Sequence, residues 1–278
     1  MIVRAGDSGE PVKALQRGLN KLGSLLLVDG QFGSSTQNAV TDAQAALGLT
    51  QQLEADDQLQ AALAAAPDLF PALTAAGVTF IGLQEVGSAA AYEQVFRDPT
   101  WPTAISGITI GIGYDLQFVT PGQFRTDWDD RLPADALDRL AAVAGVVGSR
   151  DRLALVDGVS IPLASAVFVF ASRSLRRYLD QTRVIYPTVD TLPATRRTAL
   201  VSLVYNRGPR LEDRDPDRQD RREIRAIRDL LATGAVEQVA DQFDSMARLW
   251  DPQVPGLVRR RHEEATLWRS GFAAVSVE

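Results

Sequence analysis

The chain has 278 residues, of which 45% are hydrophobic, and it carries a formal net charge of −6. These values are typical of a globular protein with one large or two smaller domains, and the acidic balance argues against a nonspecific nucleic-acid binder. The sequence contains no cysteine and a single histidine, His262, so it excludes thiolate metal sites and leaves too few imidazoles for a histidine-rich zinc site. We therefore expect no cofactor and no metal, and we expect His262 on a helix surface.

The sequence carries no segment that predicts membrane insertion. The first residues, MIVRAGDSGEPVK, lack the apolar stretch of a signal peptide, and the longest apolar run, IPLASAVFVFA at 161–171, is too short to cross a bilayer. We expect a protein without an integral membrane segment that is made in the cytoplasm. Any action outside the cytoplasm would then require release or export by another factor.

Residues 6–66 predict a small helical domain, because apolar residues recur at helical spacing between turn sequences. The first helix is expected to have Ser8 as its N-cap, Pro11 in its first turn and Gly23 at its end. A tight turn at VDGQFGSST, a second helix capped by Ser34 or Ser35, and a third helix over about 54–66 are expected to follow. Prolines at 67 and 71 then indicate a boundary, which divides the chain into domains 1–66 and 67–278.

The second domain is predicted to be mainly helical with one small β-hairpin. The hairpin is expected in the alternating, glycine-rich stretch 105–119, and LALVDGVSIPL at 153–163 is a possible second β segment. The expected helices cover 69–86, 121–129, 134–146, 163–183, 194–206, 221–232, 235–249 and 257–270. The fold class is therefore mainly α, with a three-helix bundle followed by an α+β domain.

The first domain resembles the three-helix type of peptidoglycan-binding domain. The residues that carry the resemblance are Gly6, Gly9, Val12, Leu15-Gln16, Leu19, Leu22-Gly23, Asp29-Gly30, Phe32-Gly33, Thr36, Ala39-Val40, Gln44 and Gly48-Leu49. The resemblance implies that this domain binds bacterial peptidoglycan. The alternative is a helical spacer whose glycines serve only folding.

The turn between the first two helices is the expected binding loop of this domain. Asp29-Gly30 and Gly33 force a tight turn, which we expect to expose polar groups beside the ring of Phe32. A flat polar edge next to an apolar ring suits a sugar. The peptidoglycan-binding residues are predicted to be Asp29, Gln31, Phe32 and Thr36.

The second domain resembles the phage-type lysozymes, glycoside hydrolase family 24. Glu85 ends a helix shortly before Gly87, Tyr92 follows seven residues after Glu85, and TIGIG at 109–113 is the family's hairpin motif. Two later segments, RRTALVSLVYNRGP at 196–209 and VPGLVRRRHEEATLW at 254–268, are similar to the family's closing helices. Together the two resemblances imply a modular endolysin with a lysozyme-like catalytic domain.

The implied reaction is hydrolysis of the β-1,4 bond between N-acetylmuramic acid and N-acetylglucosamine, with Glu85 as the general acid. The family's catalytic aspartate is replaced here by Gln94, so the second carboxylate is expected elsewhere, at Asp115 or, less favourably, at Asp98 or Glu93. An unbroken strand would place Asp115 about 20 Å from Thr109. Asp115 would therefore act only if a turn or bend at Gly111 or Gly113 brings it back toward Glu85.

The remaining candidate residues are expected around the same cleft. Thr109 is predicted to touch the attacking water or the sugar, and alternating Thr109, Gly111 and Gly113 are predicted to form a flat face for a sugar ring. The predicted substrate-binding residues are Tyr92, Trp101, Tyr114 and Asn206, for which a core position or a helix cap is the alternative.

Two other functions stay open at this point. If no second carboxylate exists, Glu85 alone would support a lytic transglycosylase, in which a hydroxyl of the sugar replaces water. A protein that only binds the cell wall, such as a structural component of a virion, would also accommodate Gln94. In each case peptidoglycan is the expected partner, and we expect a monomer.

Overall fold

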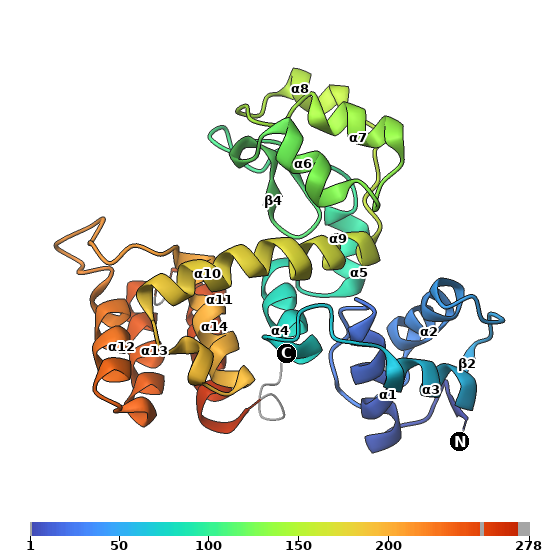
Figure 1. Cartoon of the computed structure of the whole chain (residues 1–278), viewed down its shortest axis with the longest axis horizontal. Helices are drawn as coiled ribbons and strands as arrows, with labels where there is room; N and C mark the ends of the chain where they lie inside the picture. Colours follow the sequence, from blue (N-terminus) through green and yellow to red (C-terminus); the bar gives the residue numbers. More distant parts are fainter. Residues whose placement is uncertain (1, 251–252, 272–278) are drawn as a thin grey trace. The chain divides into compact units, whose positions relative to one another are not determined.

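The computed structural model describes residues 2–250 and 253–271 and is mainly helical (Figure 1). Two small antiparallel sheets of two strands each complete the described part, which confirms the predicted fold class. The chain divides into two compact units, one comprising residues 1–71 and 82–174 and the other comprising 72–81 and 175–278. The predicted boundary near residue 67 lies inside the first unit and stays a prediction.

The first unit begins with the N-terminal helical module and continues with the hairpin and its covering helices. Its elements are β1 Val3–Arg4, α1 Glu10–Lys21, α2 Ser34–Ala46, β2 Glu54–Ala55, α3 Asp57–Ala65, α5 Ala89–Ala91, the π-helix η1 Tyr92–Phe96, β3 Thr109–Ile110, β4 Tyr114–Asp115, the 3-10 helix η2 Leu116–Phe118, α6 Pro121–Trp128, α7 Ala134–Ala141, α8 Arg150–Leu155, α9 Leu163–Val169 and the π-helix η3 Phe170–Ser174.

The second unit is a group of packed helices. Its elements are α10 Leu175–Ile185, the 3-10 helix η4 Val189–Thr191, α11 Ala194–Arg207, α12 Arg222–Ala232, the 3-10 helix η5 Val236–Gln238, α13 Val239–Met246, the 3-10 helix η6 Ala247–Leu249 and α14 Pro255–Ser270. Helix α4 Thr74–Val86 begins in this unit and ends in the first. Gly77 allows the first half of α4 to approach α11, since a Cβ there would lie 2.4 Å from Oγ1 of Thr198.

The N-terminal module has its own hydrophobic core, to which all three of its helices contribute. Its fully or nearly buried members are Val3, Val12, Leu15, Leu19, Leu26, Phe32, Ala39, Val40, Ala43, Ala55, Leu59 and Leu63. Strand β1 pairs with β2, with Val3 opposite Ala55, so the first residues of the module are tied to the start of α3. The three-helix prediction is thereby confirmed, with α3 beginning at Asp57 instead of 54.

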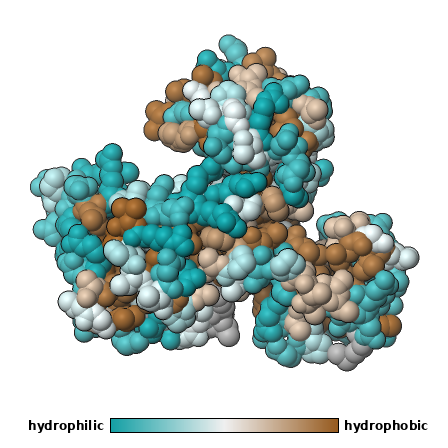
Figure 2. Space-filling view, in the orientation of Figure 1, coloured by the Kyte–Doolittle hydropathy of each residue, from teal (hydrophilic) through white to brown (hydrophobic). Residues whose placement is uncertain are grey.

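Helix α10 illustrates how the helices of the second unit bury one face. Leu175, Leu179 and Ile185 recur at helical spacing and are buried, and the opposite face carries exposed arginines, including Arg176 and Arg183. Figure 2 shows this exposed face of α10 as a run of hydrophilic residues. No helix in the described residues is both long and apolar enough to cross a membrane.

Two helices of the second unit are joined by a buried polar cluster. Ser202 of α11 donates a hydrogen bond of 2.6 Å to Glu264 of α14, which also accepts one of 2.8 Å from Arg261. Arg260 contacts the same carboxylate oxygen at 3.4 Å and donates to the carbonyl oxygen of Ser202. The motifs at 196–209 and 254–268 are therefore in contact. Their hydrogen-bonded residues Ser202, Arg260 and Glu264 hold α11 against α14.

The structure differs from the sequence prediction at two helix starts. The N-caps of α1 and α2 are Gly9 and Gly33, and neither Ser8 nor Ser34 caps a helix through its side chain. Ser8 instead forms a β-bridge with Gln31, and the φ of 90° at Gly9 is one that glycine adopts without strain.

The predicted second β segment at 153–163 is also wrong. Its first residues belong to α8, because the side chain of Ser149 accepts a hydrogen bond from the amide of Arg152 and caps a helix there. The long helix predicted over 163–183 is interrupted by the π-helix η3 between α9 and α10.

Candidate functional site

Glu85 lies in the last turn of α4 and is half-buried. The helix ends directly after it, because Gly87 adopts a φ of 76° and its amide bonds to the carbonyl of Leu83. Val86 and Leu83 beside it are buried, so the backbone that carries Glu85 is fixed. The position at the end of an apolar helix is the one that the sequence predicted.

The hairpin places Thr109 directly opposite Asp115. Strands β3 and β4 are antiparallel, with Thr109 paired with Asp115 and Ile110 with Tyr114. Residues 111–113 form the turn, in which Gly111 and Gly113 have φ values of 57° and 63°. A turn is therefore present at Gly111 and Gly113, and it makes Thr109 and Asp115 neighbours, whereas the approach of Asp115 to Glu85 stays a prediction.

The carboxylate of Asp115 is engaged with backbone amides. It accepts hydrogen bonds of 3.0 and 3.2 Å from the amide of Gly107 and one of 2.9 Å from the amide of Gln117. Asp115 is also the N-cap of η2. These contacts tie the segment before β3 to the segment after β4, so they give Asp115 a structural role in closing the hairpin.

Gly107 and Gly111 leave space for neighbouring residues of the protein and not for a ligand. A Cβ on Gly107 would lie 2.3 Å from the carboxylate of Asp115, and one on Gly111 would lie 3.2 Å from both Trp128 and Ala166. Gly111 and Gly113 lie in the turn and not on a strand beside Thr109. The prediction of one flat face formed by these three residues is therefore wrong, because close packing and the turn explain the glycines.

Tyr92 and Tyr114 are core residues, so the prediction that they bind substrate is wrong. Tyr92 is fully buried, and its hydroxyl donates to the carbonyl of Ile161 at 2.9 Å. Burial, with a smaller contribution from the charge of Glu93, raises the pKa of Tyr92. Tyr114 is 5% exposed and donates to the buried carboxylate of Asp127 at 2.7 Å.

Asp127 is a buried carboxylate that sequence reasoning missed. Besides Tyr114 it accepts a hydrogen bond of 2.9 Å from Gln123, and Arg173 lies 4.0 Å away. The ring of Tyr114 meets that of Trp128 edge to face at 5.5 Å. Asp127 thus anchors β4 to α6, and no motif in the sequence pointed to this position.

The segment between α5 and the hairpin carries the other candidates. Gln94 is exposed in η1, and Asp98 is exposed just beyond it. Trp101 is half-buried, and its ring lies against Gly148, where a Cβ would approach it to 2.5 Å. This packing against the backbone favours the core alternative for Trp101.

Asn206 belongs to the second unit and is half-buried near the end of α11. Its Oδ1 is buried and accepts no hydrogen bond from the described residues. The helix ends at Gly208, with a φ of 74°, whose amide bonds to the carbonyl of Val204. The helix-cap alternative is therefore not realised by the side chain of Asn206. His262 is exposed on α14 and bonds to Asp244 at 2.7 Å, as expected for a surface position.

The loop between α1 and α2 is organised by Gln16, a buried residue of α1. Its amide nitrogen donates to Asp29 at 2.7 Å, to the carbonyl of Gln31 at 3.1 Å and to Thr36 at 3.2 Å. Its oxygen accepts from the amide of Gly30 at 2.9 Å. A single side chain therefore fixes the loop from inside.

The prediction that four residues of this loop bind peptidoglycan is wrong for two of them, Phe32 and Thr36. Phe32 is 5% and Thr36 is 2% exposed, because the ring joins the core of the module and the hydroxyl faces Gln16. Neither side chain presents a surface to a ligand. Asp29 and Gln31 are exposed and stay predictions.

Comparison with protein families identifies the N-terminal module. Residues 8–65 match the family described as "Putative peptidoglycan binding domain", and the match includes α1, α2 and α3. This match supports peptidoglycan as the partner of the module. No curated protein matches the sequence.

Proposed function

We propose that the chain degrades peptidoglycan by hydrolysing the β-1,4 bond between N-acetylmuramic acid and N-acetylglucosamine. The observation that carries the proposal is the match of the N-terminal module to a peptidoglycan-binding domain. In the same chain this module is followed by a mainly helical part, in which Glu85 lies at the end of a helix that precedes a small hairpin. This order of elements agrees with the resemblance to phage-type lysozymes. The substrate then lies in the bacterial cell wall, which the protein, as a monomer, reaches after release or export by another factor.

Glu85 is the proposed general acid. Its carboxyl would donate a proton to the leaving oxygen of the glycosidic bond. Thr109, half-buried on β3, would orient water or the sugar, and Trp101 of the same unit is the candidate for substrate contact. An inverting enzyme also needs a second carboxylate about 6.5–9.5 Å away to activate water.

The hydrogen bonds of Asp115 make Asp98 the better candidate for this second role. Asp115 would have to give up its amide partners, Gly107 and Gln117, to act on a water. Asp98 is exposed in a bend and accepts no hydrogen bond from a backbone amide within the described residues. Glu93, the third candidate, is held by Arg97 at 3.1 Å.

A lytic transglycosylase that uses Glu85 alone is the second candidate function. Two observations favour it. The carboxylate of Asp115 already accepts hydrogen bonds from backbone amides, and Gln94 stands at the position of the family's aspartate. In that reaction a hydroxyl of the muramic acid attacks, so no second carboxylate is required to activate water.

Mass spectrometry of digested peptidoglycan tests the proposal. Reducing ends support the hydrolase, 1,6-anhydro ends support the transglycosylase, and intact glycan with the wild-type protein refutes both and leaves a wall-binding protein.

The variant Glu85→Gln adds a second arm to this test. The amide is similar in size but cannot donate the proton, so we expect a loss of activity of about 10²–10⁴-fold with an unchanged unfolding midpoint. Glu212→Gln, at an exposed position of the second unit, is the matched control and should keep full activity. Clearing of cells by Glu85→Gln within threefold of wild type would remove Glu85 from the reaction.

A further inference from the structure

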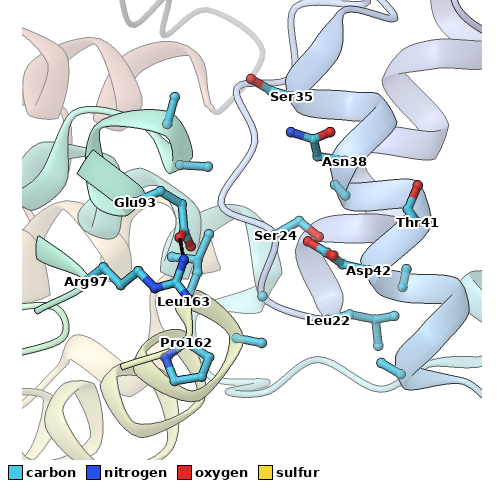
Figure 3. Close-up of a pocket in the computed structure, with 17 residues that line it drawn as sticks. Leu22, Ser24, Ser35, Asn38, Thr41, Asp42, Glu93, Arg97, Pro162 and Leu163 are labelled. Carbon is cyan, nitrogen blue, oxygen red and sulfur yellow. Dashed lines mark hydrogen bonds and ion pairs between the residues drawn. The ribbon is translucent and has the colours of Figure 1, made fainter. Parts of the chain in front are cut away.

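A groove in the first unit has one wall in the peptidoglycan-binding module. Helix α2 provides this wall with Asn38 and Asp42, and Glu93 and Arg97 of the η1 segment stand on the opposite side (Figure 3). The groove encloses about 610 Å³, within the range of pockets that hold small molecules. The floor is built from small or apolar residues, namely Leu22, Gly23, Ala39, Ala43, Ala46, Ala89, Ala90, Pro162, Leu163 and Ala164.

Close packing beneath the groove holds its two walls together. Leu25, in the loop after α1, is 2% exposed although it is not part of the module's own core. A Cβ on Gly82 would lie 2.7 Å from Leu25 and 3.6 Å from Phe170, so Leu25 occupies a site beside α4 and η3. Gly23 similarly lies against Val167 of α9, at 3.2 Å for its Cβ position. The groove is therefore a built feature of this unit.

The two walls carry complementary polar groups. Asn38 and Asp42 are exposed on one face of α2, and their side chains form no hydrogen bond or ion pair with the described residues. Across the groove Arg97 pairs with Glu93 at 3.1 Å and donates to Ser160 at 2.7 Å. Figure 3 shows the side chains of Asn38 and Asp42 directed from α2 toward the groove. A ligand would thus meet the carboxylate of Asp42 on one wall and the ion pair of Arg97 with Glu93 on the other.

The lining favours a peptide over a sugar chain. No aromatic residue lines the groove, whereas the faces of sugar rings are commonly bound by aromatic rings. A floor rich in alanine accommodates methyl-sized side chains. The carboxylates of Asp42 and Glu93 suit an ammonium group, and the guanidinium of Arg97 suits a carboxylate, so the groove fits a ligand that carries both kinds of group.

We infer that this groove binds the peptide part of peptidoglycan, a short chain that contains alanine, free carboxylates and the amine of a diamino acid. The amine would be bound by Asp42, and a carboxylate by Arg97. The inference rests on the proposed function, since it assumes that peptidoglycan is the ligand of the module. It assigns to α2 and η1 a contact that is separate from Glu85.

Calorimetric titration of the full chain with a soluble stem tetrapeptide, L-Ala-γ-D-Glu-L-Lys-D-Ala, tests the inference. Asp42→Asn and Arg97→Gln should each weaken binding about tenfold, because each removes a charge-assisted hydrogen bond. Ala46→Trp, which fills the groove from an exposed position of α2, should abolish binding. The matched controls Asp217→Asn and Arg210→Gln, at exposed sites outside the groove, should bind as wild type does.

Three results would each overturn the assignment. The first is that the wild type does not bind the tetrapeptide, and the second is that Asp42→Asn, Arg97→Gln and Ala46→Trp bind it with the affinity of the wild type. The third is that the wild type binds chitotetraose, a glycan without peptide, and that these three variants weaken this binding. Glu85→Gln separates this inference from the enzymatic proposal, since it should bind the tetrapeptide normally whether or not the wild type cleaves glycan.

Discussion

Replacing Leu25 by alanine should destabilise the first unit far more than its position in a loop suggests. The side chain is 2% exposed and lies against Gly82, where a Cβ would approach it to 2.7 Å and the ring of Phe170 to 3.6 Å. The substitution removes three carbons, worth about 2.4 kcal/mol at about 0.8 kcal/mol for each buried group. A residual cavity adds to this, so we expect a total loss of about 2–5 kcal/mol.

The backbone of Leu25 provides a second, independent signature. Its φ of 52° is in the left-handed region, which costs a residue with a Cβ about 1–2 kcal/mol. Leu25→Gly relieves this strain but loses the same contacts. We therefore expect Leu25→Gly to be at least as stable as Leu25→Ala, which is the reverse of the usual order for these two residues in a helix.

Urea denaturation followed by tryptophan fluorescence measures this effect away from the module itself. Trp101 and Trp128 lie in the 82–174 part of the first unit and Trp250 and Trp268 in the second, so no tryptophan lies in the N-terminal module. A shifted fluorescence transition therefore reports that Leu25 stabilises more than its own loop. Leu53→Ala is the control, because Leu53 is 66% exposed in the same module and should change stability by no more than about 0.5 kcal/mol. A loss below about 1 kcal/mol for Leu25→Ala would refute the proposed packing.

Two further predictions concern carboxylates. Asp115→Asn should keep both the hairpin and activity, because an amide oxygen still accepts from Gly107 and Gln117, whereas Asp115→Ala should cost about 1–3 kcal/mol; activity lost in Asp115→Asn at unchanged thermal stability would restore Asp115 as a catalytic residue. Burial alone would raise the pKa of Glu223, but hydrogen bonds from Arg248 and Arg222, both at 2.8 Å, lower it overall. The stabilisation from Glu223 is then present above its unfolded pKa of about 4.3 and is lost as the pH falls through the lower folded value. Urea midpoints of wild type and Glu223→Gln, followed by tryptophan fluorescence, should therefore differ at pH 7 and converge in acid. A difference that stays constant with pH would contradict this assignment.

The sequence by itself determined the local structure of this protein. Apolar spacing predicted most of the helices, and Gly87 and Gly208 end α4 and α11 where helix-ending glycines were expected. Asp29-Gly30 and Gly33 predicted the turn between α1 and α2. These features depend on backbone preferences and on residues a few positions apart, so a single stretch of sequence is sufficient to reveal them.

Only the tertiary structure decided which side chains are buried and which meet. The sequence around Phe32, Tyr92 and Tyr114 does not show whether these rings face solvent or a core. All three are buried because segments distant in sequence cover them. Asp115 lies opposite Thr109 because the turn at 111–113 fixes the strand register. Its carboxylate then accepts hydrogen bonds from the amides of Gly107 and Gln117. Leu25 had no distinguishing pattern in its own stretch. Its burial depends on the space left by Gly82, 57 residues later, and such contacts follow from packing and not from periodicity.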